Sequence, residues 1–468
     1  MTSAVSGGLH HPVDLEPSLL EDVGTVGSTY TTRGRRHLLD GAALLSLLVM
    51  LNLLLPQDLV VAQLSSLGRP ALLLGLVFFF GWLVSKLHPR LALRGPQPVR
   101  WAAIGYLATV LSAYAAGYLR GLPSLEANAA DRAVISTLCF LGVLLVCADG
   151  ISNRDRLDSL LKISVWCGTV MAAIGLLQAG LAVDVTKYIK IPGLSLHHGE
   201  ELGFMSRGDG FFRVASTAQH YIEFSTVMAI LLPFAVHYAM FGKRKVIRQW
   251  AIVAGVLMGA AIPMTLSRTG IVALVVGALA MMPAWSWRVR INLAGLGILL
   301  GGALMAVKPG LMGTILSMFT GAADDPSITG RTDDYAVIFS YFAERPFFGR
   351  GPGTFIPTIY FFVDNEWLQH LVTMGALGVA GLATLHLTAL TLGVLAYRRA
   401  TLREDKHLAA CLIAVQLIAI TVAATFDSMG FTTYSTMLAL MTGATGAVWR
   451  LTHPARMVRS SAPRLTND

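Results

Sequence analysis

Long apolar stretches recur along this chain and are separated by shorter polar segments. About 20 apolar residues in a row suffice to cross a bilayer as a helix. The pattern therefore predicts an all-α polytopic membrane protein with about twelve transmembrane helices. We expect these spans near residues 38–55, 70–85, 101–118, 133–148, 161–182, 219–241, 250–266, 269–285, 292–308, 368–397, 408–425 and 432–449.

Two of these intervals depart from a simple span. The interval 368–397 is long and could contain a preceding outer helix. The apolar run from Ala251 to Trp285 has Arg268 near its middle, where a guanidinium costs several kcal/mol in hydrocarbon. Lys and Arg flank this run on both sides, and such residues in short loops stay cytoplasmic. The run should therefore cross twice, with Ser267 and Arg268 at the outer tip.

The same rule orients the whole chain. With both termini cytoplasmic, most of the 36 Lys and Arg residues fall in cytoplasmic segments. The predicted organisation is a cytoplasmic tail at 1–37, a transmembrane domain at 38–450 and a second cytoplasmic tail at 451–468. Two long outer loops, at about 183–218 and 308–367, interrupt the domain. The second lies between spans nine and ten and is expected to contain a helix at Asp333–Ala343 and a turn at Pro346–Gly353.

Composition agrees with this class and excludes others. Hydrophobic residues are 54% of the chain, charged residues are 13% and the mean hydropathy is +0.62. No soluble catalytic domain fits between the spans, and we expect no removable signal peptide before the first span. The net charge of +9 is mainly an orientation signal, because no basic stretch with interleaved aromatics indicates nucleic-acid binding. The four cysteines lack metal-site spacing and are expected to be packing residues.

Polar residues converge at the predicted outer level. Arg213 ends the first large loop, Arg268 tops the hairpin, Arg331 lies in the second loop, and Asp364 and Asn365 precede the tenth span. Arginine suits bidentate recognition of phosphate oxygens, and a carboxylate can accept a proton from a hydroxyl. Such a cluster suits a lipid-linked diphosphate, whose phosphates lie at the depth of the lipid headgroups.

Each residue also has a simpler interpretation. Arg331 alone would more often extend to the membrane interface, and Arg213 could pair with Asp209 or Glu223. Asp364 could cap the tenth span, since aspartate is a preferred N-cap. Glu223 could be a counter-ion for the arginines, and His220 is either a polar interface residue or a proton shuttle. These alternatives remain open from local sequence alone.

The segments around these residues resemble the O-antigen ligase and polymerase superfamily. Thr265–Gly270 is similar to the family hairpin T-x-S-R-[GAT]. Gly330–Arg331 followed by Glu344–Phe355 is similar to its outer loop G-R…P-x-x-G-x-G…F. Asp364–Gly378 is similar to [HD]-N-x-x-L…G-x-x-G, and Arg213–His220 more loosely to R-x-x-G…P-N. The resemblance covers roughly residues 200–445.

The resemblance implies a metal-independent, inverting glycosyltransferase with a GT-C-like fold and no cofactor. The implied partners are a bilayer, a polyprenyl-diphosphate-linked glycan as donor and a glycan or glycolipid as acceptor. Arg213 and Arg268 would bind the diphosphate and stabilise it as a leaving group. Arg331 would orient the loop or add a contact, and Asn365, His220 and Glu223 would also contact substrate. The active site would lie on the outer face of the cytoplasmic membrane.

One position departs from the ligases of this family. They place a histidine as base directly before the asparagine, whereas this chain has Asp364. A solvated aspartate has a pKa of about 4, so no histidine-like acid limb is expected in the activity. The leading interpretation is a glycan polymerase or ligase. A flippase or transporter of the lipid-linked glycan is the alternative, but it would need polar residues at the midplane of the membrane.

Overall fold

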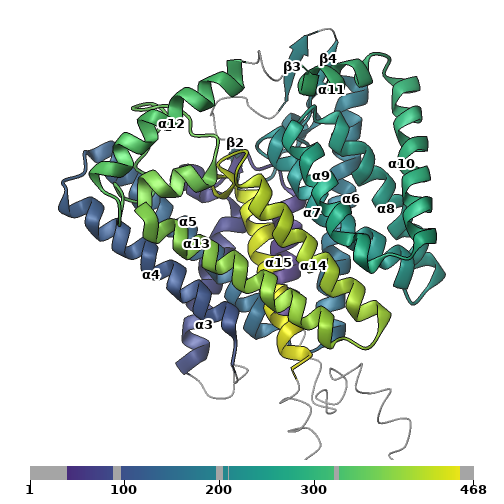
Figure 1. The fold of residues 1–468 in the computed structure, drawn as a ribbon, viewed down its shortest axis with the longest axis horizontal. Helices are drawn as coiled ribbons and strands as arrows, with labels where there is room; N and C mark the ends of the chain where they lie inside the picture. Colours follow the sequence, from purple (N-terminus) through teal and green to yellow (C-terminus); the bar gives the residue numbers. More distant parts are fainter. Residues whose placement is uncertain (1–39, 88–95, 197–203, 209, 321–325, 454–468) are drawn as a thin grey trace, which may run out of the picture.

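The computed structural model describes residues 40–87, 96–196, 204–208, 210–320 and 326–453 (Figure 1). The predicted tail at 1–37 and all but the first residues of the tail at 451–468 lie outside these ranges. Within them the chain is almost entirely helical, and its four short strands form two separate two-stranded pairs. The all-α class is thereby confirmed for the described residues.

Every predicted span coincides with one helix. These helices are α2 (Gly41–Leu54), α3 (Pro70–Leu87), α4 (Pro98–Leu119), α5 (Ser124–Gly150), α6 (Arg154–Leu181), α7 (Tyr221–Phe241), α8 (Lys245–Met264), α9 (Arg268–Met281), α10 (Trp287–Val307), α13 (Glu366–Arg399), α14 (Arg403–Val422) and α15 (Thr432–Leu451).

Nine helices in the described part of the chain are long and apolar enough to cross a membrane, by length and composition. Of the twelve expected, α2 and α9 have only 14 residues each, and α15 is not apolar enough. No residue of α10 is buried by protein, and this helix lies at the edge of the bundle (Figure 1). An apolar helix in that position is expected to face lipid.

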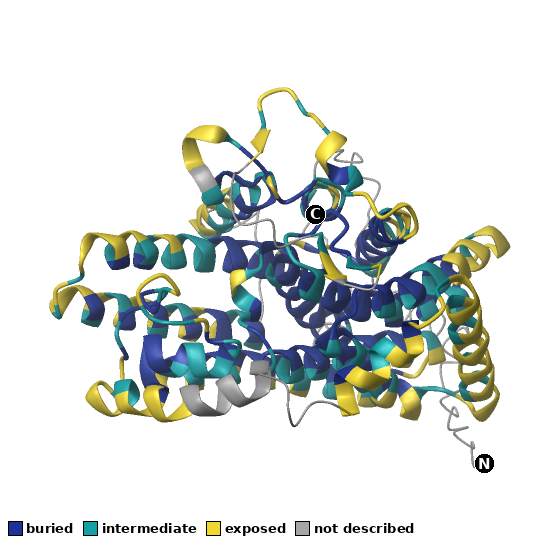
Figure 2. Ribbon diagram, turned by 90° about the horizontal axis from the view of Figure 1, so that it is seen from above, coloured by how far each residue is buried: buried dark blue, intermediate teal, exposed yellow. Residues whose placement is uncertain are grey.

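Helix α15 departs from the apolar pattern because protein surrounds it. Nineteen of its 20 residues are buried, and it packs against α5, α7, α13 and α14. A Cβ atom on Gly443 would lie 2.5 Å from the backbone oxygen of Leu144 in α5, so glycine permits the close approach. Small residues of this kind favour tight helix packing in membranes. Buried residues accordingly gather at the centre of the molecule (Figure 2).

The run from Ala251 to Trp285 forms two helices, as the charge pattern predicted. Helix α8 ends at Met264, and α9 begins at Arg268. Between them Leu266 has a left-handed backbone, with φ of 50°. Ser267 then caps α9, because its hydroxyl accepts a hydrogen bond from the amide of Gly270 at 3.2 Å. A short 3-10 turn, η4 (Met282–Ala284), follows α9.

The first outer loop contains short elements that the sequence pattern did not predict. Strand β2 (Ser195–Leu196) pairs with β1 (Leu59–Val60), and β3 (Met205–Gly208) pairs with β4 (Phe211–Arg213). The 3-10 helices η2 (Ala62–Gly68) and η3 (Val185–Tyr188) lie beside the first pair in sequence. The last connection, between α14 and α15, contains η6 (Ser428–Gly430).

The second outer loop contains two helices. Helix α11 (Leu311–Thr320) was not expected, whereas α12 (Pro326–Glu344) extends the helix predicted at Asp333–Ala343. Ile338 of α12 packs with Phe355, Val363 and Val372 in a small second core. This core holds the loop against the beginning of α13.

The predicted interruption of the tenth span is also present. Helix α13 is broken at Gly375, where φ is 65° and ψ is −165°. The predicted Pro/Gly turn docks against this break. The amide of Gly351 donates to the oxygen of Thr373 at 2.8 Å, and the amide of Ala376 donates to the oxygen of Pro346 at 2.8 Å. The turn is therefore a structural clamp on α13.

We expect Gly375→Ala to destabilise the protein by about 1–3 kcal/mol. A Cβ atom there would lie 2.4 Å from the carbonyl carbon of Phe347, and the left-handed backbone disfavours any side chain. The measurement is the thermal unfolding midpoint of the detergent-solubilised protein. Gly301→Ala in α10 is the matched control, since nothing lies within 4 Å of its added Cβ. Equal midpoints for the two variants would contradict the clamp.

Candidate active site

Arg213 is held by a strand pair and by the first residue of α7. It lies in β4, where it pairs with Met205 of β3. Its Nη1 donates to the hydroxyl of Tyr221 at 2.7 Å, and its guanidinium lies 4.5 Å from the centroid of that ring. A cation over an aromatic face gains stabilisation, so the guanidinium has a fixed position.

Arg268 is the first residue of α9 and is half-buried. The N-terminus of a helix carries partial positive charge and unsatisfied amides, which favour a bound anion. The arginine side chain adds a full charge at the same place.

Arg207, which the sequence analysis did not single out, belongs to the same positive region. It is an exposed residue of β3. Partial burial and the charges of Arg213 and Arg268 lower the pKa of Arg207. Arg213 and Arg268, which come from two separate hairpins, therefore both lie within electrostatic reach of Arg207. The sequence could have indicated Arg207 only through its position shortly before Arg213 in the same loop, where a β-hairpin would bring the two residues close together.

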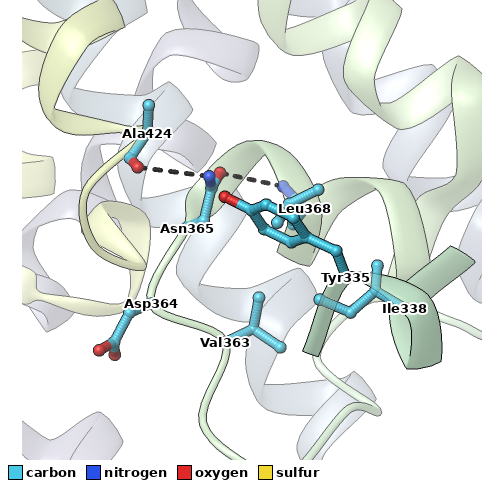
Figure 3. Close-up of a pocket in the computed structure, with 7 residues that line it drawn as sticks. All are labelled: Tyr335, Ile338, Val363, Asp364, Asn365, Leu368 and Ala424. Atoms are coloured by element: carbon cyan, nitrogen blue, oxygen red, sulfur yellow. Dashed lines mark hydrogen bonds between the residues drawn. The ribbon is translucent and has the colours of Figure 1, made fainter. Parts of the chain in front are cut away.

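Asp364 lies directly before α13 and is half-buried. The helix cap is Asn365 instead, which settles the alternative for Asp364. The side-chain oxygen of Asn365 accepts from the amide of Leu368 at 3.2 Å, and its nitrogen donates to the oxygen of Ala424 at 3.3 Å (Figure 3). Asn365 thereby fixes the backbone that carries the Asp364 carboxylate.

His220 connects the arginines with Asp364. It caps α7, with Nδ1 accepting from the amide of Ile222 at 3.2 Å. Burial and the charge of Arg213 lower the pKa of His220 to about 4, against an opposing effect of Asp364. The ring is therefore neutral at pH 7 and keeps its proton on Nε2, where it can donate to a substrate oxygen.

The carboxylate of Glu223 accepts hydrogen bonds from backbone amides and has a structural role. It is fully buried, and one carboxylate oxygen accepts from the amides of Thr433 and Tyr434 at 2.6 and 3.1 Å. The other oxygen accepts from the amide of Gln219 at 2.9 Å. A carboxylate at exposed amides of a helix N-terminus is a stabilising cap. Glu223 thus ties α7 to α15 behind the site.

Buried Arg69, which the sequence analysis missed, strengthens the same region. Its guanidinium donates to the backbone oxygen of Gln57 at 3.0 Å, the hydroxyl of Thr432 at 2.9 Å and the side-chain oxygen of Gln219 at 2.8 Å. These bonds hold the segment before His220 against the start of α15. The side chain of Arg331, in contrast, lies outside the described residues, although its backbone belongs to α12.

Further acidic groups lie near Asp364. Burial, together with Glu366 and Asp364, raises the pKa of Asp427 to about 8. The Glu366 carboxylate accepts from the amide of Met429 at 2.7 Å and lies 2.8 Å from Nδ1 of His370. Glu366 therefore holds the loop that carries Asp427 against α13.

One group of described residues has the composition of a metal site: His237, His407 and Cys411. Trp285 donates to Nε2 of His407 at 3.0 Å, so Nδ1 of His407 carries the proton. This proton faces Nδ1 of His237 at 3.2 Å. Hydrogen bonds link the three side chains, and among the described residues Nε2 of buried His237 has no hydrogen-bond partner. All four cysteines are buried and unpaired, as predicted.

One known protein family matches a region of the chain that contains several of the candidate site residues. Residues 253–383 match the O-antigen ligase family. The matched region runs from within α8 to within α13 and includes Arg268, Arg331, Asp364 and Asn365, whereas Arg213 and His220 precede it. No curated protein matches the chain. The family match confirms, over residues 253–383, the resemblance to the O-antigen ligase superfamily that was found in the sequence.

Proposed function

We propose that this protein is a membrane glycosyltransferase that transfers or polymerises a glycan from a polyprenyl-diphosphate donor. The acceptor is a sugar hydroxyl at the outer face of the cytoplasmic membrane. The observation that carries the proposal is a chain of neighbouring charges: those of Arg213 and Arg268 both act on Arg207, and those of Arg213 and Asp364 both act on His220. The match of residues 253–383 to the O-antigen ligase family supports a membrane glycan ligase or polymerase.

The arginines form the donor side of the proposed site. Arg213 and Arg268 bind the diphosphate, and their charge stabilises it as it leaves the anomeric carbon. Arg207 adds a third cation to this pair, and Arg331 remains a candidate for a further contact or for orienting the loop. The fixed positive charge supplies what a divalent cation supplies elsewhere, so we propose a metal-independent reaction without a cofactor.

Asp364 is the proposed base on the acceptor side. It removes the proton from the acceptor hydroxyl as the oxygen attacks the anomeric carbon, and the diphosphate departs from the opposite face. The bond to the diphosphate breaks and a glycosidic bond forms, with inversion. Neutral His220 donates a hydrogen bond to a substrate oxygen, and Asn365 and Glu223 position the elements that carry Asp364 and His220.

A transfer assay tests this function against the flippase alternative. Purified protein in detergent is given polyprenyl-diphosphate-linked glycan and acceptor glycan, both extracted from the source cells, in buffer containing EDTA. Mass spectrometry is expected to detect longer or transferred glycan and released polyprenyl diphosphate. The same protein in liposomes is tested for movement of the donor between leaflets. Movement without a new glycosidic bond would overturn the enzymatic proposal.

The raised pKa of Asp427 predicts an alkaline limb in the activity. Asp427 is neutral below about pH 8 and ionised above it. Ionisation adds negative charge beside Asp364 and Glu366, and this charge repels the anionic donor as its anomeric carbon approaches Asp364. The transfer rate should therefore fall above about pH 8, and Asp427→Asn should remove this fall. Asp155→Asn, at an exposed carboxylate, is the control. An unchanged limb in Asp427→Asn would contradict the assignment.

A further inference from the structure

A shallow pocket opens between α12 and the beginning of α13 (Figure 3). Tyr335 and Ile338 of α12 and Leu368 of α13 form its apolar walls. Asp364 and Asn365 form its polar side. The pocket therefore lies next to the proposed base, Asp364. The reaction proposed above assigns no role to this surface.

The charge of the pocket excludes a diphosphate. Among the described residues that line it, Asp364 is the only charged one, and none is Lys or Arg. A phosphate group placed there would meet mainly apolar side chains, and no Lys or Arg among the described lining residues would compensate its charge. A neutral ligand with both apolar and hydroxyl surfaces fits this lining better, since binding sites combine apolar walls with a few fixed polar groups.

Tyr335 and Asn365 offer the two contacts that a sugar ring needs. Tyr335 is 41% exposed and presents a flat aromatic face. The amide of Asn365 is held by its bonds to Leu368 and Ala424. Each of these bonds uses one donor or one acceptor position, so an N–H and a lone pair remain. The C–H face of a pyranose can pack on the aromatic ring while its hydroxyls bond to the amide.

The pocket lies on the acceptor side of the base. Figure 3 shows the Asp364 carboxylate pointing away from the ring of Tyr335, across the loop. The charge of the Asp364 carboxylate acts on the pKa of His220, and so does the charge of Arg213. In an inverting reaction the base and the leaving group lie on opposite faces of the reacting sugar. Glycan that extends past the base, away from the arginines, therefore belongs to the acceptor.

We infer that this pocket is an acceptor subsite that holds a neutral sugar residue adjoining the one that reacts. The sugar stacks on Tyr335 and forms hydrogen bonds with Asn365, and Tyr335 is a specificity-determining residue. The inference rests on the proposed glycosyl transfer and names the part of the acceptor that this site recognises.

Steady-state kinetics of the purified full-length protein test the subsite. Acceptor oligosaccharide, prepared by mild acid hydrolysis of polysaccharide from the source cells, is varied at saturating donor, and the donor is then varied at saturating acceptor. Tyr335→Ala should raise the KM for the acceptor about tenfold, and leave the KM for the donor unchanged. Tyr335→Phe, which keeps the aromatic face, should stay within about twofold of wild type.

Phe339→Ala is the matched control, because Phe339 lies on the same helix, is 53% exposed and does not line the pocket. It should leave both KM values unchanged. An unchanged acceptor KM in Tyr335→Ala would overturn the subsite, and so would a rise in the donor KM alone, which would assign the pocket to the donor glycan. Either result leaves wild-type transfer intact. Absence of transfer by the wild type would instead refute the proposed function.

Discussion

Replacement of Arg268 by alanine should lower the rate of glycan transfer by about 1,000-fold. Arg268 stands at the N-terminus of α9, where its charge and the helix amides face the same region as Arg207 and Arg213. Negative charge on the departing diphosphate grows as its bond to the sugar breaks, so a fixed cation lowers the barrier more than it strengthens donor binding. The measurement is the turnover number at saturating donor and acceptor.

Two further variants make this result specific. Arg268→Lys keeps the charge but loses bidentate contact, so an intermediate rate is expected. Arg288→Ala removes an exposed arginine from the first turn of α10, beyond the far end of α9, and should leave the rate unchanged. Full activity in Arg268→Ala, with normal folding, would remove this residue from the donor site.

Asp364→Asn should lower the turnover number by about 100- to 10,000-fold. The amide has nearly the same shape but cannot accept the proton of the acceptor hydroxyl. Because Asn365, and not Asp364, caps α13, the substitution should leave the thermal unfolding midpoint close to that of wild type. A large loss of stability would assign Asp364 a structural role instead.

Asp364→His separates the chemistry of the base from its position. The resemblance implies that the ligases have a histidine at this position, so the variant should retain part of its activity. Its rate should fall below about pH 6.5, where the new imidazole becomes protonated. Wild type should lack this limb, because burial and Arg213 keep the pKa of His220 at about 4. A wild-type acid limb near neutrality that Asp364→His leaves unchanged would contradict the assignment.

The hydrophobic pattern predicted the helices because each span forms its own backbone hydrogen bonds in an apolar run. Charge on both flanks of Ala251–Trp285 predicted the break before Arg268, and excess length predicted the break in α13. Helix α11 and the strand pairs were missed. The pairing of Leu59 with Leu196 joins segments far apart in the chain, and strands of two residues leave no periodic signal.

Topology brings Arg213, Arg268 and Asp364 to one predicted level, and their assignment to one site stays a prediction. In the structure the charges of Arg213 and Arg268 both act on Arg207, and those of Arg213 and Asp364 both act on His220. The environment of Glu223 was not accessible, because its partners are amides about 210 residues away in the chain. The raised pKa of Asp427 was equally inaccessible, since it depends on burial and on carboxylates from α13.

The most direct test is a cryo-electron microscopy structure of Asp364→Asn in lipid nanodiscs with the polyprenyl-diphosphate-linked glycan. This variant should bind the donor without consuming it. We expect the diphosphate oxygens within hydrogen-bonding distance of Arg213 and Arg268, and the anomeric carbon facing residue 364. A donor whose diphosphate binds elsewhere, for example at the opposite end of the helices, would contradict the proposed active site.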